Sequence, residues 1–214
     1  MSKKLIFFGN GSNIKAIYNM VSQEGIDVHG FCVDDEYHTS STFLDKPIYK
    51  FSDFVNNCPP NDYELFSPMG PKHKCQSRKR VYEQFKSLKY DFLTFIHRSA
   101  ILYTDRKNIG ENVFIGALAA CHPDIIISDN CYIGEGVLIA HDTIIGKHSY
   151  IGAGSIIGGG CNIGEEVSLG LRSTIRSQTS IASKTCIGMG VSIHRNIEKA
   201  STHIFSPLEQ KWFC

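Results

Sequence analysis

The sequence lacks an excess of charge of either sign. Its 22 Lys and Arg residues almost balance 21 Asp and Glu residues, so the formal net charge of the 214 residues is only +1. The pI of about 7.6 is close to neutral as well. A chain with so little net charge is not expected to bind a polyanion. We therefore expect neither nucleic acid nor a membrane surface as its partner.

Long apolar runs are also missing. The sequence has no stretch of about eighteen apolar residues, the length that spans a membrane. Near its start, basic residues precede an apolar run of four residues, which is too short for a signal peptide. None of the eight cysteines stands in CxxC spacing, and Cys121, Cys131 and Cys161 fall at positions that we expect to face a core. We predict reduced thiols, no metal site and a cytoplasmic location.

What the sequence does contain is an unbroken six-residue repeat from 109 to 198. An apolar residue leads each hexad, and glycine usually follows it. The leads are Ile109, Ile115, Cys121, Ile127, Ile133, Ile139, Ile145, Ile151, Ile157, Ile163, Leu169, Ile175, Ile181, Ile187 and Ile193. Four residues after each lead stands a small or β-branched residue, which suits a narrow interior. Fixed periods of this kind are typical of solenoids rather than of ordinary globular cores.

Each hexad predicts one short strand and one corner. Three hexads then close a triangular coil of eighteen residues, and five such coils account for 109–198. The coils are expected to stack by parallel pairing about 4.8 Å apart, with the leads inward. The stretch 96–101 should be the first strand, with one extra residue before Ile109 breaking the register. We therefore predict an all-β parallel β-helix over 96–200 and a C-terminal tail over 201–214.

The first part of the chain, 1–95, has a different pattern. Short apolar runs alternate with stretches in which apolar residues recur at helical spacing. The expected strands are 5–8, 28–33 and 63–66, and the expected helices contain Ile14, Ile17, Tyr18 and Val21, and then Val81, Phe85 and Leu88. This alternation indicates a Rossmann-like α/β domain with a small parallel sheet. Ligands of such sheets bind at the carboxyl ends of the strands.

A candidate phosphate site lies between the first strand and the first helix. Gly9, Asn10, Gly11 and Ser12 form a turn whose backbone amides and helix N-terminus suit a phosphate. After the second strand, Asp34 and Asp35 are placed to accept hydrogen bonds from a ribose or a base. A full dinucleotide fingerprint needs a third glycine, where this chain has isoleucine, so a plain tight turn remains the alternative.

The candidate catalytic residues are His141 and Asp142, which fall on a predicted corner of the β-helix. A neutral histidine held by a carboxylate is a general base suited to neutral pH. Eighteen residues later comes Gly159, in the middle of a run of three glycines, so an unshielded backbone amide should lie one coil above the imidazole. Such an amide is a candidate oxyanion donor, and the set suits acyl transfer to an amine or a hydroxyl.

The same corner also supplies candidate contacts for a cofactor. Continuing from Gly159 by steps of eighteen gives Ser177 and then Arg195. An extended thioester cofactor is therefore expected to lie along Gly158, Gly159 and Ser177, with its phosphates near the Arg195 cation. His122, His194 and His203 are interpreted as solvated surface residues.

Together these residues make the chain resemble the sugar acyltransferases of the left-handed β-helix superfamily. It is most similar to the nucleotide-sugar N-acetyltransferases of bacterial surface-glycan (O-antigen) synthesis, such as the bacillosamine and perosamine N-acetyltransferases. The stretches that carry the likeness are 7–11, 32–35, 92–100 and 140–142. The resemblance implies left-handed crossovers, against the usual right-handed rule.

The resemblance also implies an activity, partners and roles. It implies a homotrimer with active sites at subunit interfaces, acetyl-coenzyme A held between neighbouring helices, and a UDP-, dTDP- or GDP-linked amino sugar bound by the N-terminal domain. His141 matches the family's general base, Asp142 its acidic neighbour and Gly159 its oxyanion donor. The chain departs from the family's usual Gly-x-Pro-Ala-Lys segment at 204–209 and has Tyr150, with His148 close by, where some members carry a second histidine.

Three other functions remain open on the sequence alone. The chain is a candidate O-acetyltransferase of a sialic-acid-like sugar, or a non-catalytic module that binds a sugar nucleotide. Zinc carbonic anhydrases share the coil architecture, with metal histidines spaced by thirty-six residues and then five. In this chain His122, His141 and His148 are separated by nineteen and seven residues, which does not match that pattern.

Overall fold

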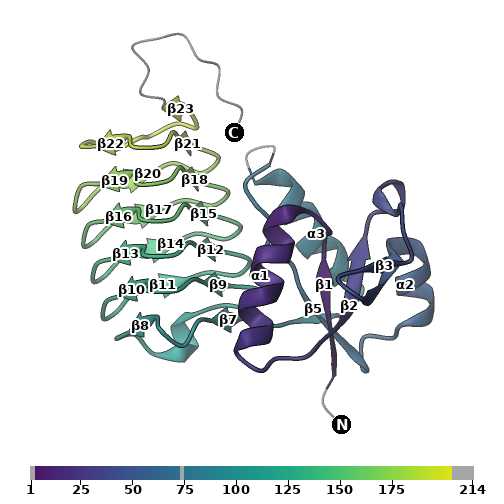
Figure 1. The fold of residues 1–214 in the computed structure, drawn as a ribbon. Helices are drawn as coiled ribbons and strands as arrows, with labels where there is room; N and C mark the ends of the chain where they lie inside the picture. Colours follow the sequence, from purple (N-terminus) through teal and green to yellow (C-terminus); the bar gives the residue numbers. More distant parts are fainter. Residues whose placement is uncertain (1–2, 73–74, 204–214) are drawn as a thin grey trace.

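The computed structural model describes residues 3–72 and 75–203, which form an α/β domain followed by a left-handed parallel β-helix (Figure 1). The strands of the first domain are β1 (Lys4–Phe8), β2 (Val28–Val33), β3 (Thr42–Phe43), β4 (Lys46–Lys50), β5 (Tyr63–Phe66) and β6 (Asp91–Phe92). Its helices are α1 (Ser12–Gln23), η1 (Asp35–Tyr37), α2 (Phe51–Asn57) and α3 (Gln76–Ser87). The strands form one sheet in the order β3-β4-β2-β1-β5-β6.

Helices cover both faces of this sheet because successive side chains of β1 point to opposite sides. Phe7 packs in the core that includes Ile14 and Ile17 of α1. Ile6 packs in a second core with Phe85 of α3 and residues of α2. The sheet thus has α1 on one face and α2 and α3 on the other, as the alternating pattern of the sequence predicts.

Two features of the first domain differ from the prediction. The sheet is not wholly parallel, because β3 pairs antiparallel with β4 at one edge, and α2 follows directly. None of β3, β4 and α2 was expected from the sequence. Leu88, which we placed on the buried face of the last helix, lies just beyond α3 and is 40% exposed. The helix ends at Ser87, so the residues that follow no longer keep its periodicity.

The β-helix consists of two-residue strands that begin with β7 (Phe95–Ile96), β8 (Ile101–Leu102) and, after η2 (Arg106–Asn108), β9 (Phe114–Ile115). The remaining strands are β10 (Ala120–Cys121), β11 (Ile126–Ile127), β12 (Tyr132–Ile133), β13 (Leu138–Ile139), β14 (Ile144–Ile145), β15 (Tyr150–Ile151), β16 (Ile156–Ile157), β17 (Asn162–Ile163), β18 (Ser168–Leu169), β19 (Thr174–Ile175), β20 (Ser180–Ile181), β21 (Cys186–Ile187), β22 (Ser192–Ile193) and β23 (Thr202–His203).

These strands form the three faces of a prism. The domain-facing sheet contains β7, β9, β12, β15, β18, β21 and β23; the first open face contains β8, β10, β13, β16, β19 and β22; and the second open face contains β11, β14, β17 and β20. Pairing is parallel with a register of eighteen residues, as in Tyr132 opposite Tyr150. The first coil is offset by one more, with Phe95 opposite Phe114, which confirms the extra residue expected before Ile109.

The interior of the prism is filled as the repeat predicts. Every lead from Ile109 to Ile193 is buried, and Cys121, Cys131 and Cys161 are buried and free. Burial raises the pKa of the Cys121 and Cys131 thiols to about 12, so they stay protonated. No helix in the described part of the chain is long and apolar enough to cross a membrane.

The two domains meet along the domain-facing sheet. Rings of Phe95, Phe114, Tyr132 and Tyr150 stack in a continuous column, with neighbouring centroids 4.6–5.8 Å apart. Phe95, Phe114 and Tyr132 belong to the same core as the residues of α1. The column explains why aromatic residues occupy this one face of the helix: they are covered by the first domain and not by water.

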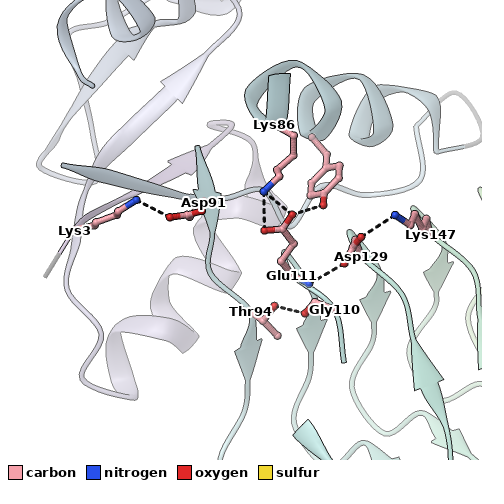
Figure 2. A network of polar contacts seen from close by, with 9 residues as sticks. Lys3, Lys86, Asp91, Thr94, Gly110, Glu111, Asp129 and Lys147 are labelled. Carbon is pink, nitrogen blue, oxygen red and sulfur yellow. Dashed lines mark hydrogen bonds and ion pairs between the residues drawn. The ribbon is translucent and has the colours of Figure 1, made fainter. Parts of the chain in front are cut away.

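Helix α3 lies along the corner between the second open face and the domain-facing sheet, where charged residues hold it in place (Figure 2). Glu111 accepts a hydrogen bond from the Tyr82 hydroxyl (2.5 Å) and forms an ion pair with Lys86 (2.8 Å). One coil on, Asp129 accepts from the Glu111 amide (3.2 Å) and pairs with Lys147 (3.0 Å). These contacts fix the position of α3 relative to the coils. They thereby also fix the carboxyl edge of the sheet, near which α3 begins.

Candidate active site

His141 and Asp142 lie at the corner between the first and second open faces, between β13 and β14. We call this the open corner. His141 Nδ1 donates a hydrogen bond to Asp142 Oδ2 at 2.7 Å. Since the proton is then on Nδ1, a neutral ring has its lone pair on Nε2. Both side chains are 64% exposed, so solvent and ligands reach them.

The local backbone explains how Asp142 reaches the imidazole. Its φ is +56°, the left-handed conformation that Asp and Asn tolerate better than most residues. Its amide donates to the carbonyl oxygen of Pro123 in the coil below, at 3.2 Å. The turn therefore directs the carboxylate back onto its neighbour, which is where a group that orients a base must lie.

His141 lies directly against Gly159 of the next coil. A Cβ placed on Gly159 would be 2.7 Å from His141 Nε2 and 2.8 Å from its Cε1. Gly159 has no positive φ, so its backbone does not require glycine. Ala117 and Ala153, two residues after their leads like Gly159, show that this corner position accepts a Cβ. Glycine occurs at 159 because the imidazole takes the space of a side chain.

The Gly159 amide is available to a ligand. Within residues 3–72 and 75–203 it has no hydrogen-bond acceptor. The equivalent amides of Glu111 and Glu165 each donate to a side chain one coil on, Asp129 Oδ1 at 3.2 Å and Ser183 Oγ at 3.0 Å. An unbonded N–H beside a base is the arrangement that stabilises charge on a carbonyl oxygen.

Thr143 ties these two coils together from inside the prism. Its fully buried hydroxyl donates to the Gly158 carbonyl oxygen (3.0 Å) and accepts from the Cys161 amide (3.3 Å). Ser149 makes the same pair of bonds at another corner, to Gly164 and Val167. The interior hydroxyls thus fix the corners, and at Thr143 the fixed corner is the glycine run opposite His141.

The candidate cofactor contacts share the open corner. Ser177 is exposed and lies above Gly158, because a Cβ on Gly158 would be 2.6 Å from Ser177 Oγ. The Gln178 amide donates to the Gly159 carbonyl oxygen at 2.8 Å, so backbone hydrogen bonds between successive coils continue along this corner. Arg195 is exposed after β22, farther along the same corner. The part of the expected tail at 204–214, including Pro207, lies outside the described residues.

The glycine turn of the first domain has the expected geometry. Gly9 has a φ of +113°, and a Cβ there would be 3.0 Å from Ile14. Gly11 is the N-cap of α1, which begins at Ser12, and no side chain caps these first amides. Asn10 donates to the Tyr37 carbonyl oxygen at 3.4 Å. The turn therefore leaves a helix N-terminus open at the carboxyl edge of the sheet.

Both candidate carboxylates of this domain already have partners. Asp34 accepts two hydrogen bonds from Arg80, at 2.6 and 3.1 Å. Asp35 accepts from the Ser52 amide at the start of α2 (3.0 Å), and this hydrogen bond holds the pKa of Asp35 below its usual value. Asp35 thus also serves to hold α2 in place. The sequence did not reveal Arg80, since nothing local connects it with Asp34.

His148 is buried at the domain junction. Its Nδ1 accepts a hydrogen bond from the Asn130 side-chain Nδ2 at 2.8 Å, and the Tyr82 ring packs edge-on against it. Burial, with Lys79 and Arg78 nearby, lowers the pKa of His148 to about 4. Glu166 and Lys147 also face it. His148 is therefore neutral and structural rather than a partner of His141.

Within one chain the two candidate sites are far apart on the fold. The first domain covers the domain-facing sheet, whereas His141 is on the opposite edge of the prism, between β13 and β14 (Figure 1). Among the described side chains, no group of three or more His, Cys, Asp and Glu residues is placed to hold a metal ion.

Part of the six-residue repeat matches a family model. Residues 124–159 match the bacterial transferase hexapeptide family model of six repeats. His141, Asp142 and Gly159 all fall within the matched residues. A comparison with curated proteins finds no match to the sequence.

Solved structures with the same fold cover 94% of the chain. PerB from Caulobacter crescentus, in complex with CoA and GDP-perosamine, has a TM-score of 0.80 at 20% identity over 92% of its length. The acetyltransferase domain of PglB from Neisseria gonorrhoeae, in complex with acetyl coenzyme A, has a TM-score of 0.82 at 20% identity over 96%. WeeI from Acinetobacter baumannii has a TM-score of 0.79 at 16% identity over 94%. The resemblance to left-handed β-helix sugar N-acetyltransferases is confirmed at the level of fold.

Proposed function

We propose that the protein is an acetyl-coenzyme A dependent N-acetyltransferase that acts on the amine of a nucleotide-linked deoxy amino sugar in bacterial surface-glycan synthesis. The observation that carries the proposal is the contact of His141 Nε2 with Gly159, the single glycine among the third positions of the fifteen hexads. PerB and the PglB domain, both of this fold, are solved with CoA and with acetyl coenzyme A.

The corner residues fit this chemistry. Acetyl-coenzyme A supplies a thioester, whose carbonyl carbon the substrate amine attacks. His141 Nε2 takes the proton of the attacking amine, and Asp142 stabilises the imidazolium that forms. The Gly159 amide donates to the carbonyl oxygen as negative charge develops on it. The C–S bond then breaks, and the proton held by His141 is returned to the departing thiolate. Gly158, Ser177 and Arg195 are proposed contacts of the coenzyme.

The nucleotide part of the substrate is proposed to bind at the other site. The turn from Gly9 to Ser12 leaves the N-terminus of α1 open, which favours phosphate. Asp34 and Asp35 lie at the same sheet edge, which is where ligands of such sheets bind. We propose this edge as the nucleotide-sugar site, in a cytoplasmic enzyme.

We further propose that the working form is a homotrimer. The first domain of one chain is on the opposite side of the prism from its own His141, so a sugar held there would reach the base of another copy. The two open faces carry exposed isoleucines that suit an interface: Ile101 (49%), Ile156 (48%), Ile126 (44%) and Ile144 (42%).

The test is acetyl transfer itself. The full-length protein is incubated with acetyl-coenzyme A and UDP-, dTDP- or GDP-linked deoxy amino sugars, and the products are analysed by mass spectrometry. We expect one acetyl group per sugar, resistant to base, because amides survive treatment that cleaves esters. A base-labile product would make the protein an O-acetyltransferase, and no product with any substrate would contradict the proposed activity.

A further inference from the structure

The sheet of the first domain has a point at which its strand order reverses. The chain runs from β1 outward to β2 and β4, and then returns to β5 on the other side of β1. In open parallel sheets, ligands bind outside the carboxyl ends of the strands at such a point. Asn13 of α1 already bridges this region, since its side-chain Nδ2 donates to the Pro68 carbonyl oxygen after β5 at 3.2 Å. Asp34 follows β2 at the same edge.

Arg80 reaches this edge from the opposite face of the sheet. Helix α3 follows β5 and runs back over the sheet, so its first turns lie near the carboxyl ends of the strands. Arg80 Nη2 donates to Asp34 Oδ2 at 2.6 Å and Arg80 Nη1 to Oδ1 at 3.1 Å. Nη1 also donates to Gln84 Oε1 at 3.1 Å. The guanidinium is thus presented as a planar fork, with its side chain 50% exposed.

The two basic residues before Arg80 have other partners. Arg78 is fully buried and donates to the Asn130 carbonyl oxygen at 2.7 Å. Lys79 pairs with Glu166 of the β-helix at 2.9 Å. Beside Arg80 an open hollow of about 650 Å³ is lined by Gln76, Lys79, Arg80, Glu83 and Gln84. Arg80 is therefore the member of this basic run that pairs with a carboxylate at the carboxyl edge of the sheet.

We propose that Arg80 binds the diphosphate of the nucleotide-linked substrate, and that the ion pair between Arg80 and Asp34 forms only in the absence of this ligand. The inference rests on the proposed function for the identity of the ligand as a nucleoside diphosphate sugar. Phosphate oxygens match the same two-pronged geometry as a carboxylate. A phosphate therefore exchanges with Asp34, and the released carboxylate becomes free to accept a hydrogen bond from a ribose hydroxyl.

The first test is calorimetric titration of the full-length protein with UDP, dTDP and GDP. Replacing Arg80 with Gln should weaken binding of the preferred nucleotide about 10- to 100-fold, since a charge-assisted hydrogen bond is lost. Lys46→Gln is the matched control. It removes the pair between Lys46 and Asp27 (3.1 Å), which lies at the opposite edge of the sheet, before β2 and at the start of β4. This variant should bind as the wild type does.

The second test asks whether replacing Asp34 strengthens or weakens the binding of inorganic pyrophosphate. If the Asp34 carboxylate competes with phosphate, Asp34→Asn should tighten the binding of inorganic pyrophosphate by about two- to fivefold, as expected for removing an exposed ion pair. If Asp34 merely orients Arg80, the same change should weaken it. Weaker binding in Asp34→Asn, unchanged diphosphate binding in Arg80→Gln, or no binding of any of the three nucleotides by the wild type would overturn the proposal.

The outcomes separate this proposal from the proposed function. Acetyl transfer with an unchanged KM for the nucleotide sugar in Arg80→Gln would refute the role of Arg80 and leave the acetyltransferase intact. Diphosphate binding that depends on Arg80, in a protein that transfers no acetyl group, would refute the proposed function and leave the binding site. Thermal melting of each variant checks that it is folded.

Discussion

The substitution Gly159→Ala separates the catalytic role of the open corner from its structural role. The new Cβ would lie 2.7 Å from His141 Nε2, well inside van der Waals contact, so the exposed imidazole must move by about 1 Å. Misplacement of a catalytic group by this distance costs about 100-fold in rate. We therefore expect kcat/KM to fall by about that factor in a steady-state assay of acetyl transfer.

Stability should hardly change in the same variant. The backbone at Gly159 has no positive φ, and Ala117 and Ala153 occupy equivalent positions. We expect the free energy of unfolding to stay within about 0.5 kcal/mol of the wild type. Gly160→Ala is the matched control: its φ of +68° makes alanine strained by about 1 kcal/mol, yet a Cβ there would approach only Gln178 Cγ, at 3.6 Å, and not the His141 imidazole. Full activity in Gly159→Ala would refute the proposed geometry.

Three further predictions follow from other parts of the structure. Thr143→Val removes a buried hydroxyl and should cost about 2 kcal/mol of stability and lower kcat. Thr143→Ser should restore both, whereas Ser149→Ala should lose similar stability with kcat retained; equal kcat losses would contradict a role for Thr143. The His148 pKa of about 4 is below its ordinary 6.5, so the stability that it contributes is complete above pH 6.5 and is lost as pH falls towards 4, by about 3 kcal/mol. Denaturant titrations of His148→Asn should lack this part of the acid sensitivity, and an identical pH profile would refute it. Ile144→Glu places a charge on an exposed apolar face and should dissociate the proposed trimer in sedimentation experiments; an unchanged sedimentation coefficient would show that this face is not an interface.

The β-helix could be predicted from the sequence because its period is short and unbroken. A lead every sixth residue fixes both the strand and the coil, so the register of eighteen residues follows from counting alone. The same counting places His141 beneath Gly159, and the structure has that contact. In a fold of this kind, spatial neighbours are separated by a constant number of residues, so the sequence contains the geometry of the corner.

The first domain does not have this property. Strand β3 has only two residues, which is too short to show a period, and Pro47 within β4 argues against a strand there. The link between Arg80 and Asp34 spans 46 residues and depends on how α3 packs on the sheet. One signal was present at the junction: Asn112, Asn130 and His148 are polar and eighteen apart, as expected for a corner that is covered by protein.

The most direct test of the account is the turnover of His141→Ala with acetyl-coenzyme A and the preferred nucleotide-linked amino sugar. The account predicts a kcat lower by about two to four orders of magnitude, the range for loss of a general base, with unchanged binding of the coenzyme by calorimetry. His122→Ala, a lower histidine on the same corner, should keep wild-type turnover. Undiminished turnover in His141→Ala would contradict the account, because the imidazole beneath Gly159 would then take no part in the reaction.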